Sequence, residues 1–192
     1  MRRKTFDQIV TFVGFGLSAL LLVAAGLLNW GATFAEENVA SQLEMQNIAF
    51  PAEDGLPDAT RTQLAKWAEQ KVVTGEMARH YSDLYILEHM KASSTAVMGK
   101  AATYSEVSGA YMGLVRGGST DTKKIEQLGD LRQTLFMGNT LRGMLLQAYA
   151  FGTMGVIAGY AALASLGGAI LFLVLGVAAV LHRRHTGEEV LI

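Results

Sequence analysis

Two uncharged stretches near the ends of the chain constrain its fold more than any other feature of the sequence. The first runs from Ile9 to Trp30, and its 22 residues include no charged side chain. At about 1.5 Å per residue, a helix of this length reaches roughly 33 Å, which is enough to cross the hydrocarbon core of a bilayer. The second runs from Gly143 to Leu181 and also lacks charge. Together they predict a protein with two membrane-spanning helices.

The second stretch holds 39 residues, which is too long for a single span. At about 1.5 Å per residue it would reach roughly 58 Å, yet no polar break divides it into two spans and a turn. A hairpin would also place Arg183 and Arg184 outside the cell, against the positive-inside rule. We therefore expect one span over 159–181, with its helix continuing outward through 143–158. A tight hairpin over 143–181 is the alternative.

Basic and aromatic residues flank both stretches in the way expected at membrane boundaries. Basic residues precede the first span and follow the second, which predicts that both termini are cytoplasmic and the central segment is extracytoplasmic. A signal peptide cleaved after Thr33 and Ala35 is the alternative, but the first stretch is longer than the roughly 7–15 residues of a signal core. The expected boundary anchors are Arg2, Arg3, Lys4, Trp30, Arg142, Tyr149, Arg183 and Arg184.

The segment between the spans is predicted to be a helical domain. It holds 11 Lys/Arg and 14 Asp/Glu, and its apolar residues recur mainly at helical spacing. The fold class that we expect is an all-α membrane protein whose two transmembrane helices extend into a small extracytoplasmic helical bundle. The predicted segments are a cytoplasmic tail (1–8), a transmembrane helix (9–30), an extracytoplasmic domain (31–142), an outer helix extension (143–158), a second transmembrane helix (159–181) and a cytoplasmic tail (182–192).

Local signals predict where helices begin and end in the first half of this domain. Residues 32–46 contain no Gly or Pro, so we expect the first membrane helix to extend through them. Pro57 favours the first turn of a helix that reaches about Val72. Thr74 is the predicted N-cap of a helix to about Lys91, and the small and polar residues that follow predict a break.

The second half of the domain carries a more specific signal. Thr103 and Glu106 have the spacing of a capping box, in which each side chain bonds a backbone amide of the other residue. The helix that they open is expected to end at 117–118, because paired glycines favour a helix end. The last helix should begin at 119–122, with an interruption near 129–130, and then continue into the second apolar stretch.

Composition excludes several classes of protein. A chain without cysteine has no disulfide, no thiolate metal site and no iron–sulfur cluster. Its 16 basic and 17 acidic residues leave no positive surplus for nucleic acid. The spans hold no charged residue that would mark an ion path and no histidine that would bind haem. We expect no cofactor and no small-molecule substrate, and as partners the lipid bilayer and either other membrane-protein subunits or a second copy.

Glu76, His80 and Asp83 form the best metal-ligand candidate. Spacings of four and three place the three side chains on one helix face, where they could ligate zinc. The alternative is a solvated face with weak side-chain pairs, because no other helix supplies an evident histidine ligand. His89 lies nine residues from His80, on the opposite side of an ideal helix, and we interpret it as structural.

Small residues in the spans predict a helix-packing surface. Gly155 and Gly159 form a GxxxG pattern that Gly152 extends by about one turn, and Gly14 and Ser18 have the same spacing in the first span. Such stripes let a second backbone approach closely. The surface could bind a partner subunit, or it could pack the two helices of this chain against each other.

Five stretches are distinctive as a set: KTFD at 4–7, TGE at 74–76, TYSEVS at 103–108, LRGMLLQAYAFGTMGVIAG at 141–159 and HRR at 182–184. Together they resemble an uncharacterised actinobacterial family of membrane proteins with two predicted spans, and the resemblance implies a membrane location. Members of that family are sometimes labelled aromatic ring-opening dioxygenases, whose chemistry needs iron held by histidines and a carboxylate. His80 and His89 cannot share one face of a regular helix, so the residues do not supply that ligand set.

Our leading hypothesis is therefore a non-enzymatic membrane protein that serves as an accessory, assembly or scaffold subunit of a larger cell-envelope or respiratory complex. The alternative is a metal-dependent enzyme, or a metal or ligand sensor, that acts through the extracytoplasmic domain.

Overall fold

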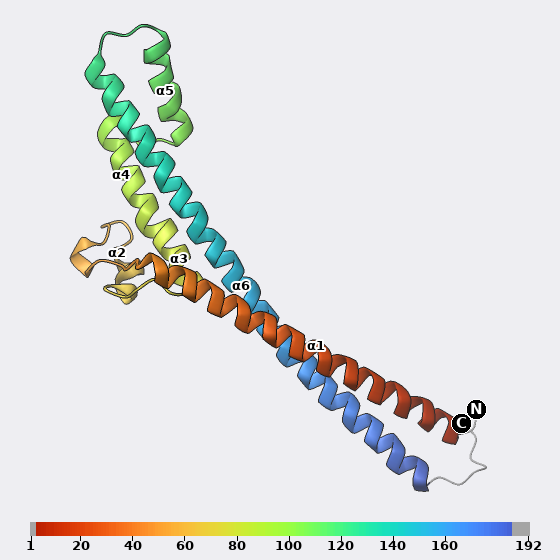
Figure 1. The fold of residues 1–192 in the computed structure, drawn as a ribbon. Helices are drawn as coiled ribbons and strands as arrows, with labels where there is room; N and C mark the ends of the chain where they lie inside the picture. Colours follow the sequence, from red (N-terminus) through yellow and green to blue (C-terminus); the bar gives the residue numbers. More distant parts are fainter. Residues whose placement is uncertain (1–2, 186–192) are drawn as a thin grey trace. The chain divides into compact units, whose positions relative to one another are not determined.

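The computed structural model describes residues 3–185, and within them the chain is helical without a strand (Figure 1). This confirms the all-α prediction. Most of the described residues belong to two long helices, which carry the two apolar stretches. The elements are α1 (Arg3–Gln46), the 3₁₀ turn η1 (Glu53–Gly55), α2 (Arg61–Leu64), the 3₁₀ turn η2 (Ala65–Trp67), α3 (Gly75–His80), the π-helix η3 (Tyr81–Ile86), α4 (Leu87–Met98), α5 (Tyr104–Arg116) and α6 (Thr122–His185).

The chain forms two compact units. Unit 1 comprises Met1–Glu36 and Met154–Ile192, and unit 2 comprises Glu37–Thr153. In unit 1, the first part of α1 lies beside the last part of α6 (Figure 1). Both helices are long and apolar enough to cross a membrane.

Small residues bring the two helices of unit 1 close together. A Cβ atom built on Gly14 would lie 3.1 Å from the backbone oxygen of Phe172 and 3.2 Å from the Cα of Gly176. One turn further along α1, the buried Ser18 hydroxyl donates a 2.9 Å hydrogen bond to the Ala169 carbonyl oxygen. Small side chains and a polar bond across the interface are the usual means by which apolar helices associate without a hydrophobic driving force.

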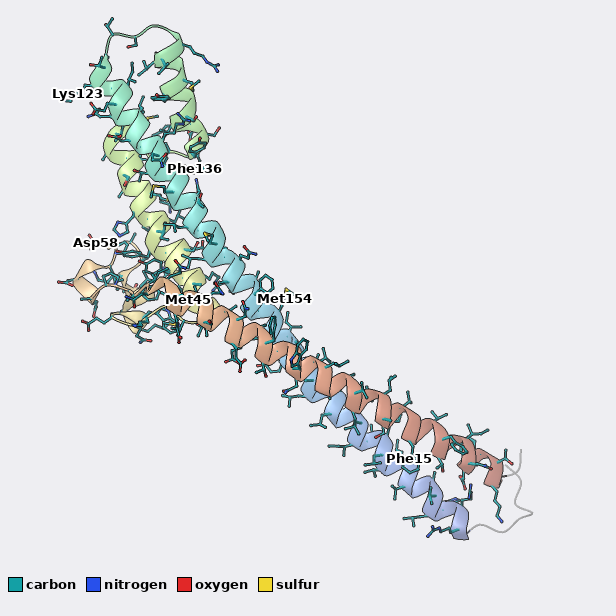
Figure 2. All side chains as sticks on the ribbon, in the orientation of Figure 1. Phe15, Met45, Asp58, Lys123, Phe136 and Met154 are labelled. Atoms are coloured by element: carbon teal, nitrogen blue, oxygen red, sulfur yellow. The ribbon has the colours of Figure 1, made fainter. Side chains whose placement is uncertain are left out.

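The outward faces of the same two helices are apolar and uncovered (Figure 2). Phe12 is 71% exposed, Trp30 68% and Leu163 66%. Large apolar side chains at such exposure, repeated along both helices, form a surface that a water-soluble protein would not normally present.

The two long helices match the sequence-based expectation in part. α1 does extend through residues 32–46 and ends where Asn47 adopts a positive φ of 49°. α6 is one continuous helix, so the hairpin alternative for 143–181 is wrong. The interruption expected near 129–130 is also wrong. Gly129 lies inside α6, which continues through it without a break. A Cβ at this position would meet the Tyr111 ring at 3.4 Å, an ordinary van der Waals contact.

The helix expected from Pro57 to Val72 is likewise wrong, since only the short α2 and η2 form there. Two extended segments pair instead. The Phe50 amide donates to the Gln70 carbonyl at 3.0 Å, and the Val72 amide donates to the Ile48 carbonyl at 2.9 Å. This pairing uses backbone amides and carbonyls that the end of the predicted helix would have needed for its own hydrogen bonds. Helical periodicity in the sequence does not reveal that this segment pairs with another segment about twenty residues away.

Thr74 caps the following helix as predicted, because its hydroxyl accepts a 3.2 Å bond from the Met77 amide. The helix does not end near Lys91, however. It continues through η3 and α4 to Met98 and ends at Gly99, whose φ is +73°. One polar residue of the stretch that was expected to break the helix, Ser94, is buried. Its hydroxyl donates to the Lys91 carbonyl and accepts from the Ala102 amide.

The capping box of Thr103 and Glu106 is confirmed at the start of α5. The Glu106 carboxylate accepts a 2.8 Å bond from the Thr103 amide, and the Thr103 hydroxyl accepts a 3.3 Å bond from the Glu106 amide. The hydrogen bond from the Thr103 amide and the neighbouring Lys100 ammonium lower the pKa of the Glu106 carboxyl group from 4.5 to about 2. α5 ends at Arg116, before the glycine pair, as expected.

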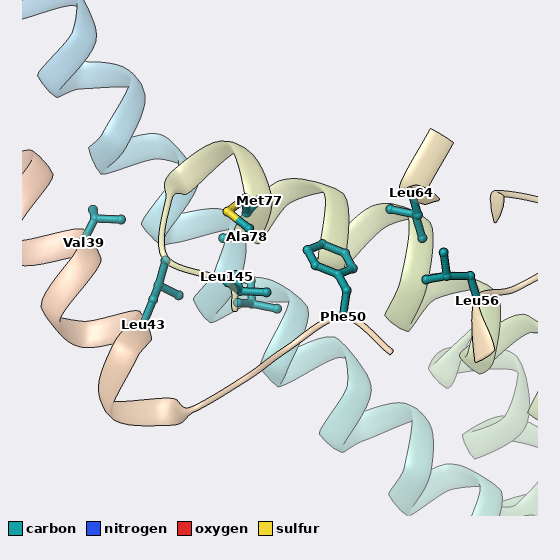
Figure 3. Close-up of a cluster of buried hydrophobic side chains, with 9 residues drawn as sticks. Val39, Leu43, Phe50, Leu56, Leu64, Met77, Ala78 and Leu145 are labelled. Carbon is teal, nitrogen blue, oxygen red and sulfur yellow. The ribbon is translucent and has the colours of Figure 1, made fainter. Parts of the chain in front are cut away.

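Two hydrophobic clusters form the interior of unit 2. The first gathers side chains from α1, the 48–72 loop, α3 and α6 (Figure 3). The second lies between α4, α5 and α6. The buried members of the first are Val39, Leu43, Phe50, Leu56, Leu64, Val72, Met77, Ala78 and Leu145, and those of the second are Met90, Val107, Leu128, Leu131 and Leu135.

Gly14 provides a test of the helix pairing in unit 1. We expect Gly14→Ala to destabilise the folded chain by about 1–3 kcal/mol, because the new methyl group meets backbone atoms that cannot move independently. Thermal unfolding in detergent, followed by circular dichroism, measures the effect. Gly16→Ala is the matched control, since nothing lies within 4 Å of its Cβ position and alanine favours a helix. Equal melting temperatures for the two variants would contradict the observed packing.

Candidate interaction site

The three residues proposed as metal ligands have separate partners in the structure. The Glu76 carboxylate lies 3.7 Å from the Lys66 ammonium, and the His80 Nδ1 hydrogen-bonds to the Glu76 carbonyl oxygen at 2.8 Å. Asp83 pairs with Arg142. Among residues 3–185, no group of three or more His, Asp or Glu side chains is arranged to hold a metal ion. The shared helix face therefore does not produce a ligand set.

His89 also has a partner of its own. Its ring meets the ring of Tyr85 edge to face, with the centroids 4.5 Å apart. The Tyr85 ring in turn contacts Tyr81 at 4.8 Å. The histidine is part of an aromatic row along η3 and α4.

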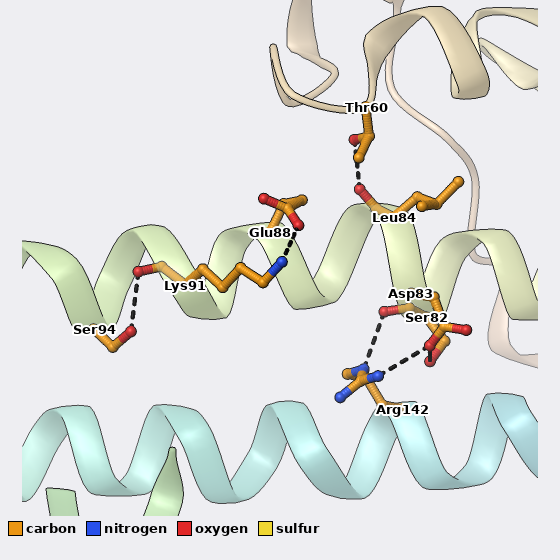
Figure 4. A network of polar contacts seen from close by, with 8 residues as sticks. All are labelled: Thr60, Ser82, Asp83, Leu84, Glu88, Lys91, Ser94 and Arg142. Atoms are coloured by element: carbon orange, nitrogen blue, oxygen red, sulfur yellow. Dashed lines mark hydrogen bonds and ion pairs between the residues drawn. The ribbon is translucent and has the colours of Figure 1, made fainter. Parts of the chain in front are cut away.

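Arg142 holds the π-helical segment in place (Figure 4). Its Nε donates to the Ser82 carbonyl at 3.2 Å, and its Nη2 donates to the Asp83 carboxylate at 2.9 Å. The Ser82 carbonyl also accepts the Leu87 amide, the i to i+5 bond that defines a π-helix. One guanidinium thus bonds both the backbone and a side chain of the widened turn.

A second bond secures the other side of the same turn. The Thr60 hydroxyl donates to the Leu84 carbonyl at 2.7 Å, which ties the loop before α2 to η3. A π-turn leaves carbonyl groups poorly satisfied within the helix, and here two side chains distant in sequence supply the donors.

The small residues predicted as a packing surface contact other parts of this chain. Gly14 and Ser18 pack against α6 as described, and a Cβ on Gly155 would meet the Ala35 side chain at 3.0 Å. Gly159 faces Ala32 more loosely, at 3.8 Å. In unit 2, Gly152 lies against Gly75 at the start of α3. Of the two interpretations in the sequence analysis, the contacts match packing within the chain.

Most of the predicted boundary anchors lie within the described residues. Trp30 stacks on Phe34, with ring centroids 5.8 Å apart, and the Arg79 guanidinium lies 5.1 Å from the centre of the Tyr149 ring. Arg183 and Arg184 are exposed, and Lys4 is partly buried. Arg2 and the Arg3 side chain lie outside the described part of the chain. Whether these residues meet a membrane boundary stays a prediction.

His182 and Asp7 form a contact that the sequence analysis did not anticipate. The His182 Nδ1 lies 2.9 Å from the Asp7 carboxylate, which is only 11% exposed. The two residues are 175 positions apart, and the contact joins the C-terminal end of α6 to the start of α1 within unit 1.

The α5–α6 patch is a concave surface in unit 2, lined by Tyr104, Gly129, Arg132, Gln133 and Phe136 around a cavity of about 260 Å³. The Tyr104 and Phe136 rings lie 6.1 Å apart. The side chain of Phe136, labelled in Figure 2, is 54% exposed. The Arg132 guanidinium lies 5.1 Å from the centre of the Tyr111 ring.

Arg132 also sets the electrostatics of the α5–α6 patch. Its guanidinium beside the Tyr104 hydroxyl lowers the pKa of that hydroxyl, and the same contact raises the pKa of Arg132. The arginine therefore has a tyrosine on each side, Tyr104 and Tyr111. Tyrosine, arginine and large apolar side chains around a hollow are the residue types that contribute most to binding at protein interfaces.

Sequence reasoning missed this patch because its members come from two helices. Tyr104 was visible only as part of the capping-box motif, and Arg132 and Phe136 are four residues apart on α6. The signal that could have revealed the patch is Phe136, an aromatic residue that shares a helix face with the polar residues Arg132 and Gln133.

No family model, no curated protein and no solved structure matches the chain. The resemblance to an actinobacterial two-span family therefore stays a prediction.

The contacts of Arg142 give a direct test of the π-helical segment. We expect Arg142→Gln to destabilise unit 2 by about 1–3 kcal/mol, because Asp83 and the Ser82 carbonyl both lose a charged donor. Hydrogen exchange should also become faster at the amides of 82–87. Denaturant unfolding and exchange mass spectrometry measure the two effects, with the exposed Arg116→Gln as control. Unchanged exchange over 82–87 would show that Arg142 does not stabilise this turn.

Proposed function

We propose that the chain is a non-enzymatic protein of the cell membrane, with two transmembrane helices, cytoplasmic termini and an extracytoplasmic segment between the helices. We propose that it acts as an accessory, assembly or scaffold subunit of a larger cell-envelope or respiratory complex. The α5–α6 patch is the observation that carries the partner-binding role.

The surface of unit 1 supports membrane insertion. Its two helices pack through small residues on one side and expose large apolar side chains on the other. In a bilayer those exposed side chains meet lipid, and all helical backbone groups are bonded within each helix. In water the same surface would be strongly unfavourable.

The α5–α6 patch supports partner binding. Its residues lie outside the predicted spans, so lipid does not account for its exposed ring. The Arg132 guanidinium lies over the Tyr111 ring beside Tyr104, so a cation and aromatic rings are already gathered at the patch before any partner arrives. The neighbouring Met137 is 53% exposed and extends the apolar area beside Phe136.

Topology can be tested with single cysteines, because the chain has none of its own. The Asp58 side chain is 90% exposed, and Arg184 is also exposed. We expect a membrane-impermeant maleimide to label Asp58→Cys in intact cells and to label Arg184→Cys only after permeabilisation. The reverse labelling pattern would overturn the orientation, and recovery of both variants in the soluble fraction would overturn membrane insertion.

The partner role can be tested by mild extraction of the tagged chain from its native membrane, followed by quantitative mass spectrometry. We expect a stoichiometric complex whose recovery falls roughly tenfold or more in Phe136→Ala, as is typical of a central aromatic contact. Phe34→Ala is the control, since Phe34 is 55% exposed but lies in unit 1. A chain that migrates alone as a monomer, with no protein lost in Phe136→Ala, would refute the subunit role.

A further inference from the structure

The charge at the α5–α6 patch is carried by one arginine. Among the described residues that line its cavity, Arg132 is the only charged one. Elsewhere in unit 2, Arg61 and Arg142 each pair with an aspartate. Arg132 has no carboxylate partner within the part of the chain that the structure describes, and its contacts are the Tyr104 hydroxyl and the Tyr111 ring. The wall of the cavity therefore carries a positive charge that no neighbouring anion neutralises.

The acidic side chains close to Arg132 in the two helices do not supply the missing anion. Glu106 is the one acidic residue of α5, and its carboxylate already lies 3.0 Å from the Lys100 ammonium and accepts the Thr103 amide. On α6, Asp130 lies two residues before Arg132 and does not line the cavity. An arginine on a hollow surface without its own anion favours a ligand that brings one.

The hydrogen-bonding groups beside the arginine also favour an acceptor. A guanidinium has five N–H donors and no acceptor, and in the described structure only the Tyr104 hydroxyl accepts from that of Arg132. The exposed Gln133 side chain lines the same cavity and adds an amide NH₂ that donates to no other described residue. A carboxylate has two oxygens that only accept, so it can use both groups at once.

The size of the cavity and its aromatic wall restrict the ligand further. The Tyr104 and Phe136 rings form the apolar side, and Phe136 is more than half exposed. The volume of about 260 Å³ lies below the roughly 300–1,000 Å³ that is usual for small-molecule sites. A space of this size suits one or two side chains of a protein better than a whole small-molecule ligand.

Other occupants match the patch less well. A neutral apolar side chain would cover Phe136 but would take the Arg132 cation out of water without a partner. A phosphate group carries up to two negative charges, and this wall holds one cation to neutralise them. A single carboxylate beside an apolar side chain matches both the charge and the exposed ring.

We propose that the α5–α6 patch binds a carboxylate of a partner protein, with Arg132 as its counter-ion and an apolar side chain of the partner against Phe136. This inference rests on the proposed subunit role and adds the chemistry of the segment that the partner presents. The carboxylate is an acidic side chain or the carboxyl terminus of the partner, and the experiment below distinguishes these two sources.

A carbodiimide reaction tests for the carboxylate directly, because this reagent couples an amine to a carboxylate that lies in contact with it. Arg132→Lys places an amine on the wall of the cavity. The tagged full-length variant is extracted from its native membrane in mild detergent, treated with the carbodiimide and analysed by mass spectrometry. We expect an amide link from the new amine to an Asp, a Glu or the carboxyl terminus of the partner. Arg116→Lys is the matched control, since Arg116 is exposed on α5 and does not line the cavity, and it should not form this link.

Recovery of the complex gives a second and independent measurement. We expect Arg132→Met to reduce recovery of the partner roughly tenfold, because a charge-assisted hydrogen bond is lost and the partner's carboxylate is left unpaired. Arg116→Met removes the same charge from α5 outside the cavity and should leave recovery unchanged. Circular dichroism checks that the variants fold. If Arg132→Met does not fold, the link formed by Arg132→Lys decides.

The outcomes separate this proposal from the subunit role on which it rests. A complex that is lost in Phe136→Ala but kept in Arg132→Met, with no link from Arg132→Lys, would overturn the carboxylate and leave the subunit role intact. Links only to carboxylates of this chain itself, such as Asp130, would overturn it as well. A chain that is extracted without any partner would overturn both proposals.

Discussion

The side-chain sequence of α6 determines much of the packing in both units, because one continuous helix supplies residues to each. Leu128, Leu131 and Leu135 recur at the helical period and fill the second cluster, and Leu145 reaches the first. Where a neighbour must come closer, the residue is glycine. Met90 occupies the space over Gly138, with its sulfur 2.6 Å from where a Cβ would be. Large and small residues alternate along the helix according to what lies against each turn.

The π-turn of η3 depends on this helix as well. The Ser82 carbonyl, which accepts the Leu87 amide in the widened turn, accepts a second hydrogen bond from Arg142 of α6. The guanidinium also neutralises Asp83, which is 40% exposed. Arg142 is the last charged residue before the uncharged run. Its position is suited to a membrane boundary, but its contacts in the structure are with the protein.

Elements determined by local sequence could be predicted, and those determined by distant contacts could not. The two long helices, the Thr74 cap and the Thr103–Glu106 capping box each follow from residues within one or two turns. The pairing of 48–50 with 70–72 and the arginine bonds of η3 join residues twenty or sixty positions apart. The α5–α6 patch was not foreseen, since it combines side chains from separate helices. The metal site predicted at Glu76, His80 and Asp83 was a local prediction that distant residues changed. A shared helix face brings the three side chains near one another, but Lys66 pairs with the Glu76 carboxylate and Arg142 pairs with the Asp83 carboxylate.

The contact between Met90 and Gly138 leaves part of the interior with no room for an oxidised methionine. Oxidation of a methionine adds an oxygen atom to the sulfur and turns an apolar group into a polar one. The Met90 sulfur already occupies the space that any other residue at 138 would fill, so a sulfoxide has no room toward α6. Met137 and Met144 are more than half exposed and can accept the same oxygen without moving a helix. Gly138 lets α4 pack so closely on α6 that the Met90 sulfur stays buried while the two helices remain together. The same close packing leaves no space for the added oxygen of a sulfoxide.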